Sequence, residues 1–128
     1  MIKPADIVLP AYNDESGITR SFNINLLHRM NAELGANFDP GGFAHAPEYD
    51  ENEGIAKSYL LSGCDQSVDI NAIGKTYHFH AGEKIHTEIS RKYNDEIVCG
   101  LLQQTDFSIA AKFTDKNHYF ADYLLNRN

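Results

Sequence analysis

Residues 18–35 have the sequence ITRSFNINLLHRMNAELG, which predicts the first element of the fold. Its large apolar side chains recur every three or four residues, a spacing typical of one face of an α-helix. They are Ile18, Phe22, Leu26, Leu27, Met30 and Leu34. Gly35 then suits a left-handed helix end. Upstream, Asn13, Asp14 and Ser16 offer side chains that can cap the start, so we predict one well-defined helix here.

On the N-terminal side of this helix, Ile7 to Leu9 precede Pro10 and predict a short extended segment or an approach to the helix. On its C-terminal side, residues 39–42 (DPGG) form a turn cluster. Short apolar or alternating segments then follow one another, separated by polar and glycine-containing turns. They are residues 43–49, 55–61, 67–70, 76–80 and 85–93. Sequential strands joined by such turns favour an antiparallel meander.

The last part of the chain changes character. Asn94 can cap a helix whose apolar side chains share one face, namely Ile97, Val98, Leu101 and Leu102. Two apolar strands, residues 107–113 and 119–125, follow across a polar turn at residues 115–118. The predicted fold class is therefore α+β in a single domain: an N-terminal helix, an antiparallel β meander, then a helix and a terminal β hairpin.

Composition limits the classes of partner. The chain has 128 residues, of which 42% are hydrophobic, and this suits one domain with a core. Its net charge of -7 and pI near 5.2 disfavour binding to nucleic acid or to an anionic membrane, because both require a cationic surface. The apolar run after Met1 is too short for an export signal, and Cys64 and Cys99 are isolated. We therefore expect a cytoplasmic protein with two reduced, buried thiols.

Two motifs carry a resemblance to a known family. The first joins Ala11-Tyr12-Asn13-Asp14 to residues 22–27 (FNINLL) and 31–36 (NAELGA), and the second is Thr87-Glu88-Ile89-Ser90 followed by Lys92-Tyr93. Both resemble the carboxy-terminal part of the histidine-specific, S-adenosylmethionine-dependent methyltransferases, the family that trimethylates histidine on the way to ergothioneine. The resemblance runs over nearly the whole chain.

The resemblance implies a partial class I methyltransferase fold that lacks the cofactor-binding half. Residues 1–93 would be the substrate-recognition insertion, and residues 94–128 the closing elements of the methyltransferase sheet. No strand is followed by a G-x-G-x-x-G pattern that opens a helix, so we do not expect this chain alone to bind S-adenosylmethionine. The N-terminal methyltransferase half would act in cis or in trans. Whether the chain by itself is an enzyme stays open.

The resemblance also assigns three substrate-binding residues and no catalytic residue. The family's Tyr at the position of Tyr12 holds the amino-acid backbone of histidine, and its Glu and Ser at Glu88 and Ser90 face the imidazole. Alternation along a strand points Glu88 and Ser90 to one face and Thr87 and Ile89 to the other. An acceptor beside a hydroxyl suits an imidazole edge. The chain has Ser58 where the family has a pocket-lining Met, so the expected substrate, which accepts the methyl group, is histidine or a related amino acid.

A second cluster supports an alternative. His78, His80, Glu83, His86 and Glu88 lie close together in sequence. Two histidines at i and i+2 of a strand share a face, but the spacing to a third metal ligand is wrong, and we expect no bound metal. The alternative is a stand-alone module without catalysis, which binds a small molecule or a metal or interacts with another protein. In either case the apolar terminal helix and strands predict a homodimer, since without a larger sheet they leave an exposed face and edge.

Overall fold

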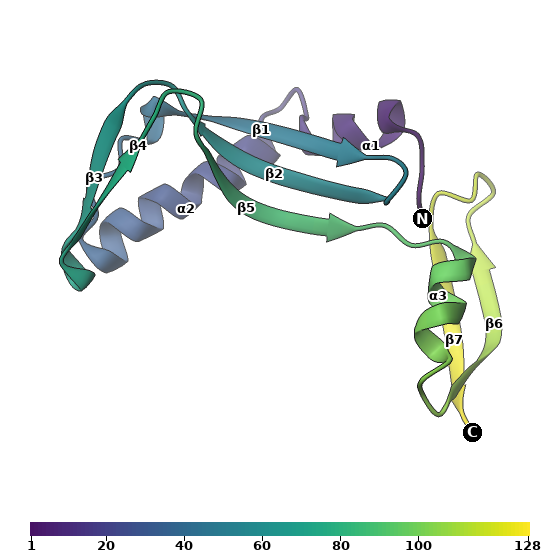
Figure 1. The fold of residues 1–128 in the computed structure, drawn as a ribbon. Coiled ribbons are helices and arrows are strands. Elements are labelled where there is room, and N and C mark those ends of the chain that lie inside the picture. The colour runs from purple at the N-terminus through teal and green to yellow at the C-terminus, as the bar shows by residue number, and fades with distance from the viewer.

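The computed structural model describes residues 1–128 and confirms the α+β class with antiparallel sheets (Figure 1). The helices are α1 (Ala5–Tyr12), α2 (Ile18–Leu34) and α3 (Asp95–Leu102), with short 3-10 turns at Pro40–Gly42 and Asn71–Ile73. The strands are β1 (Phe43–Asp50), β2 (Ile55–Ser62), β3 (Gln66–Ile70), β4 (Lys75–Phe79), β5 (Lys84–Arg91), β6 (Phe107–Thr114) and β7 (Ala121–Arg127).

Helix α2 has the predicted bounds and caps. The carboxylate of Asp14 accepts hydrogen bonds from the backbone amides of Ile18 and Thr19, at 2.8 and 2.9 Å. These bonds satisfy donors that have no partner within the helix. At the other end, Gly35 takes a left-handed conformation with φ of 59°, which a side chain would disfavour.

The segment before Pro10 is helical rather than extended. It forms α1, which includes Pro10 and buries Val8. Two contacts from the far end of the β1–β2 hairpin hold its start. Glu51 accepts a hydrogen bond of 3.1 Å from the amide of Ala5, and the Tyr49 hydroxyl donates to the carbonyl of Lys3. Packing and a carboxylate at the helix N-terminus thus outweigh the local preference that Pro10 imposes.

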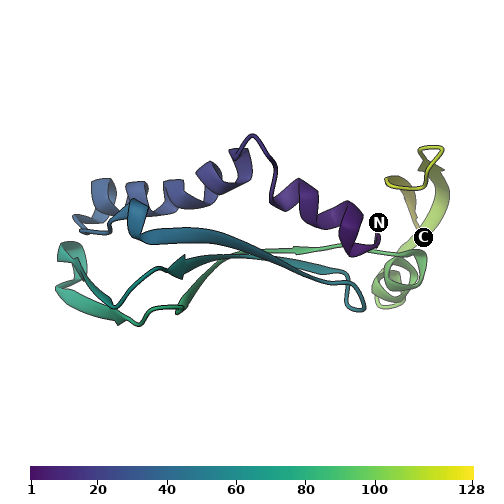
Figure 2. The same cartoon turned by 90° about the horizontal axis from the view of Figure 1, so that it is seen from above.

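Both α1 and α2 lie on one face of a three-stranded antiparallel sheet in the order β1-β2-β5, and the other face is open (Figure 2). Strands β3 and β4 form a separate pair that continues this sheet beyond a bend. At the bend the amide of Ser62 donates to Glu83 and that of Gly82 donates to Ser62. The predicted antiparallel pairing is thus confirmed, but successive strands do not all pair as in a simple meander: the last hairpin is long and bent, so that β5 pairs with β2 and β4 with β3.

The core lies between α2 and the bent hairpin. Its six buried hydrophobic members are Leu27, Phe38, Phe43, Leu60, Val68 and Ile70. Only part of the predicted α2 stripe reaches it, because Ile18 and Phe22 are each 71% exposed and Leu26 is also uncovered. Those three residues, spaced four apart, form an apolar stripe along α2 that no other part of the chain covers.

The C-terminal helix and hairpin form where the sequence predicts them. The Asn94 side chain accepts a hydrogen bond from the amide of Ile97, and Asp95 pairs with Lys112 and Tyr123 across α3, β6 and β7. The β6–β7 sheet shares no strand with the others and stands beyond the end of β5 (Figure 1). No residue from 94 to 128 is buried. Its exposed large apolar side chains are Leu101, Phe107, Ile109, Phe113, Tyr119, Phe120, Leu124 and Leu125.

The expectation of buried thiols is wrong. Cys64, in the bend after β2, and Cys99, on α3, are both exposed and free. The bend and the uncovered α3 leave neither sulfur a core to enter. None of the three helices has the length and apolar character that crossing a membrane requires.

Candidate functional site

Lys92 joins two of the three predicted site residues. It lies just after β5, and its Nζ donates hydrogen bonds to the hydroxyls of Tyr12, at 2.5 Å, and Ser90, at 2.8 Å. The ammonium also lies 4.9 Å from the centre of the Tyr12 ring, within the range of a cation–π contact. Tyr12, at the end of α1, and Ser90, on β5, are therefore adjacent in space although distant in sequence. Lys92 belongs to the second sequence motif, but nothing in the sequence alone indicates its contact with Tyr12.

Glu88 lies on the same face of the sheet as Ser90. In the β2–β5 register Glu88 is opposite Ser58 and Ser90 is opposite Ala56, and both β2 residues are buried on the side that carries the helices. The predicted shared face is thus observed, and Glu88 and Ser90 are both half-buried.

Thr87 departs from strict alternation. The register shifts between Ser58 and Tyr59, which leaves Thr87 as an extra residue on β5. Its hydroxyl oxygen lies 2.6 Å from Oδ1 of Asn23 and 3.0 Å from the Ser58 carbonyl. It therefore faces α2, on the side of the site, and not the opposite face as alternation predicts.

Asn23 is a polar residue at the centre of the α2 contact. It is only 3% exposed, and its amide nitrogen donates to the carbonyl of Thr19. A buried amide requires hydrogen-bond partners, and the Thr87 hydroxyl supplies one at the position where β5 bulges. The pair fixes α2 against β5 next to Glu88. In the sequence, the sign of this contact is an asparagine that lies one residue away from the apolar stripe of α2.

Two buried polar atoms on this face have no hydrogen-bond partner. They are Nε2 of His45, on β1, and Oγ of Ser58, on β2. Burial lowers the pKa of the His45 imidazole, and the Arg20 guanidinium acts in the same direction. The carboxylates of Glu88 and Asp14 oppose this shift without cancelling it. His45 is therefore a neutral member of the same polar region.

The lowered pKa of His45 predicts that stability falls from about pH 7.5 to about pH 5.5, around the unfolded-state value near 6.5. The unfolded chain takes up a proton more readily than the folded one, so the stability that neutral His45 allows is present above the unfolded pKa and is lost as pH falls below it. Urea unfolding at both pH values should show that the free energy of unfolding drops less for His45→Gln than for the unchanged chain. Equal drops would contradict this assignment.

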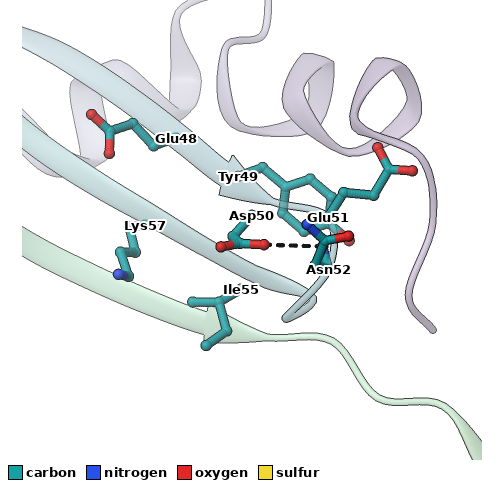
Figure 3. Close-up of a pocket in the computed structure, with 7 residues that line it drawn as sticks. All are labelled: Glu48, Tyr49, Asp50, Glu51, Asn52, Ile55 and Lys57. Carbon is teal, nitrogen blue, oxygen red and sulfur yellow. Dashed lines mark hydrogen bonds between the residues drawn. The ribbon is translucent and has the colours of Figure 1, made fainter.

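The cavity in Figure 3 lies at the β1–β2 turn and is not part of this polar cluster. It measures about 440 Å³ and is lined by Glu48, Tyr49, Asp50, Glu51, Asn52, Ile55 and Lys57. Asp50 accepts the amide hydrogen bond of Asn52 within the turn, while Tyr49 and Glu51 extend toward α1 (Figure 3). Four of the lining residues thus make structural contacts, in the turn or at the start of α1.

Other hollows flank α2. A small one of about 190 Å³ adjoins the Asn23–Thr87 contact. A larger groove of about 470 Å³ lies between α2 and the bent hairpin, and ten of its eleven lining residues are hydrophobic. The apolar groove suits contact with protein or lipid-like surface better than recognition of a charged amino acid.

The histidines that favoured a metal-binding alternative are dispersed. His78 bonds with the Ser67 hydroxyl at 2.7 Å, and His80 lies 3.7 Å from Asp65 in the bend. His86 stacks on Tyr59, on the open face of the sheet, with ring centres 5.0 Å apart. The chain contains no group of three or more His, Cys, Asp or Glu placed to hold a metal ion.

The helix starts do not suit a dinucleotide-type cofactor site. Such a site requires a strand that leads through a glycine-rich turn into a helix. Here α1 begins after Pro4, α2 begins at Gly17 after another helix, and α3 follows β5 through Asn94 with no glycine. The residues present therefore do not fit S-adenosylmethionine.

Comparison with known proteins places the chain in a family. The sequence model of a family described as histidine-specific, S-adenosylmethionine-dependent methyltransferase matches residues 1–127. The chain belongs to this family, as the two sequence motifs predict.

Three curated relatives show the same relation. The chain is 31% identical to the histidine N-alpha-methyltransferase of Mycolicibacterium smegmatis, over 90% of this chain and 36% of that protein. It is 35% identical to the Mycobacterium tuberculosis protein of the same name, over 77% of this chain and 30% of that protein. It is 27% identical to ergothioneine biosynthesis protein 1 of Schizosaccharomyces pombe, over 96% of this chain and 16% of that protein. The chain thus spans about a third of the length of the bacterial relatives and less of the yeast one.

Proposed function

We propose that residues 1–128 form the substrate-recognition portion of an S-adenosylmethionine-dependent N-methyltransferase that acts on histidine or a related amino acid. The observation that carries this proposal is the bridge from Lys92 to Tyr12 and Ser90, on the sheet face that also bears Glu88. Tyr12, Glu88 and Ser90 are the proposed substrate-binding residues. Membership of the family supports the choice of amino acid.

The chemistry of these groups suits an imidazole-bearing amino acid. Glu88 as a carboxylate accepts hydrogen bonds only, whereas the hydroxyls of Tyr12 and Ser90 can donate. An imidazole edge needs an acceptor for its N–H and a donor for its free nitrogen, and a substrate carboxylate needs donors. Methyl transfer further requires that the amine be held close and aligned. The residues named here would hold the acceptor, and the cofactor would supply the methyl group.

The proposal is tested by titrating L-histidine into the complete polypeptide by calorimetry, with L-alanine as the control. We expect saturable binding of histidine and none of alanine at the same concentration. Equal heats from the two amino acids would show that no imidazole is recognised and would remove the basis of the proposal.

We also propose a division of the chain at residue 93. Residues 1–93 would form the recognition unit, and residues 94–128 would complete the sheet of a cofactor-binding domain in cis or in trans. Support comes from the separate β6–β7 sheet and from the uncovered stripe on α2. Cytoplasmic location is proposed on the two free, exposed cysteines, which suit a reducing compartment.

One prediction concerns the cofactor. Residues 1–128 alone should not bind S-adenosylmethionine, because none of the three helices begins with a glycine-rich turn after a strand. Calorimetric titration should give no heat of binding at high ligand concentration. A dissociation constant below the high micromolar range would show that a cofactor site exists on these elements.

Another prediction concerns association. The exposed apolar side chains of residues 94–128 and the free edges of β6 and β7 should drive formation of a homodimer when no larger sheet covers them. Sedimentation velocity over a range of concentrations should show a dimer, and replacing exposed Phe113 and Leu124 by Ser should shift it toward monomer. A monomer at every accessible concentration would contradict the prediction.

A further inference from the structure

We propose that a hollow at the junction of β5, α3 and β7 binds a small aromatic carboxylate that carries no ammonium group. The lining of this junction hollow includes Arg91, Lys92, Tyr93, Val98, Phe120 and Tyr123. Such a site goes beyond the proposed function and does not depend on it.

The junction hollow lies where β5 ends and residues 94–128 begin, beside the N-terminus (Figure 1). It measures about 240 Å³, and six of its eight lining residues are hydrophobic. Small-molecule sites typically combine such an apolar lining with a few polar groups and measure about 300–1,000 Å³. The smaller volume here suits a ligand with a single ring.

Hydrogen bonds and close packing hold the β5 side of the junction hollow without a ligand. The amide of Lys92 donates to the Gly54 carbonyl at 2.6 Å, and the amide of Ile2 donates to the Tyr93 carbonyl at 2.9 Å. Gly54 has no room for a side chain, because an added Cβ would lie 2.7 Å from Cγ1 of Ile2. A wall that is already fixed costs less free energy to order when a ligand binds.

Both cations of the junction hollow keep their full charge. Arg91 takes part in none of the side-chain ion pairs of the chain. The Lys92 ammonium donates hydrogen bonds only to the hydroxyls of Tyr12 and Ser90, which carry no charge. The two positive charges are therefore available to a ligand.

No negative charge at the hollow offsets these cations. None of the eight lining residues is Asp or Glu. Asp95 contacts the lining residue Tyr123, but its carboxylate already accepts hydrogen bonds from the Tyr123 hydroxyl and from Lys112, the latter at 2.6 and 2.8 Å. An anionic ligand thus meets positive charge without opposition, and the Arg91 guanidinium can match a carboxylate through two parallel hydrogen bonds.

The rings at the junction hollow favour an aromatic ligand. Tyr93 and Phe120 are 42% and 62% exposed, so their surfaces are open to contact. Aromatic pairs prefer edge-to-face or offset stacking, and a flat ring in the hollow can adopt either against them. An aromatic amino acid also brings an ammonium group, which Arg91 and Lys92 would repel and no lining carboxylate would accept. The ligand class is therefore an aromatic carboxylate without an amino group.

The experiment titrates 3-phenylpropanoate into the unchanged chain by calorimetry, beside three matched compounds. L-Phenylalanine adds the ammonium group, 3-phenylpropanamide removes the charge, and inorganic phosphate removes the ring. We expect saturable binding of 3-phenylpropanoate and an affinity about ten-fold weaker or less for each matched compound, the usual effect of losing a charged hydrogen-bond partner. Comparable affinity for any of the three overturns the proposal, and so does a lack of saturable binding of 3-phenylpropanoate.

Variants locate the ligand, each with a control that makes a similar change elsewhere. Arg91→Gln should weaken binding of 3-phenylpropanoate by about ten-fold or more, whereas Lys75→Gln, on β4, should leave it unchanged. Phe120→Ser should also weaken it, whereas Phe22→Ser, in the exposed stripe of α2, should not. Full binding by both Arg91→Gln and Phe120→Ser overturns the proposal.

A measurement on the unchanged chain keeps the location testable even if a variant does not fold. In amide NMR spectra, titration with 3-phenylpropanoate should shift the signals of residues 91–93 and 120–123. Shifts confined to other parts of the chain would place the ligand elsewhere and overturn the proposal.

Discussion

Leu60→Ala is expected to unfold much of residues 1–93 under conditions in which the unchanged chain is folded. Leu60 lies on the central strand β2, is 0% exposed, and belongs to the six-residue core. Removing a buried leucine side chain typically costs about 2–5 kcal/mol, through lost burial and the cavity left behind. Only 12 of 128 residues are buried, so few other contacts remain to offset that loss.

Urea unfolding followed by circular dichroism measures the effect. The matched control is Leu101→Ala on α3, because Leu101 is 60% exposed and should change stability by no more than about 0.5 kcal/mol. If the two variants had the same midpoint, the core would not lie where the structure places it.

Glu88→Ala is expected to produce the second large effect, on substrate recognition. Losing the charged partner of a substrate hydrogen bond typically costs about 1.5–3 kcal/mol. With residues 1–128 grafted into a complete relative, in place of its matching region, the KM for histidine should therefore rise by roughly ten-fold or more. The Mycolicibacterium smegmatis protein is a suitable recipient, since the similarity covers 90% of this chain.

Two further variants define the origin of that effect. Glu88→Gln keeps the shape and one acceptor oxygen, so its KM should lie between those of Glu88→Ala and the unchanged chimera. Lys116→Ala, in the exposed turn between β6 and β7, should leave KM unchanged. A Glu88→Ala chimera with an unaltered KM would show that Glu88 is a structural surface residue.

The elements with strong local signals were predictable from the sequence. Periodicity and Gly35 gave α2, and short polar side chains gave the caps at Asp14 and Asn94. The helical form of α1 was not predictable, because it depends on Glu51 and Tyr49, which reach it from the β1–β2 hairpin. Local sequence also predicts which residues form strands better than where a hairpin bends, since the bend after Ser62 depends on bonds across the two arms.

In the candidate site, too, the features that depend on local sequence were predictable and those that depend on distant contacts were not. Spacing along one strand was enough to place Glu88 and Ser90 on a common face. It could not reveal that Lys92, two residues beyond Ser90, would reach Tyr12 at the end of α1. That contact depends on how α1 docks on the sheet. Nor could it reveal the Thr87 bulge, which depends on the register between β2 and β5.

The lack of buried residues after residue 93 has a consequence for how this part of the molecule holds its shape. A helix and hairpin with no interior of their own gain little free energy from folding alone. Their amides should therefore exchange with deuterium far faster than those of α2 or β2 when the segment is uncovered. When a neighbouring sheet covers it, folding and docking become one equilibrium, and the measured affinity is lowered by the free energy needed to order the segment.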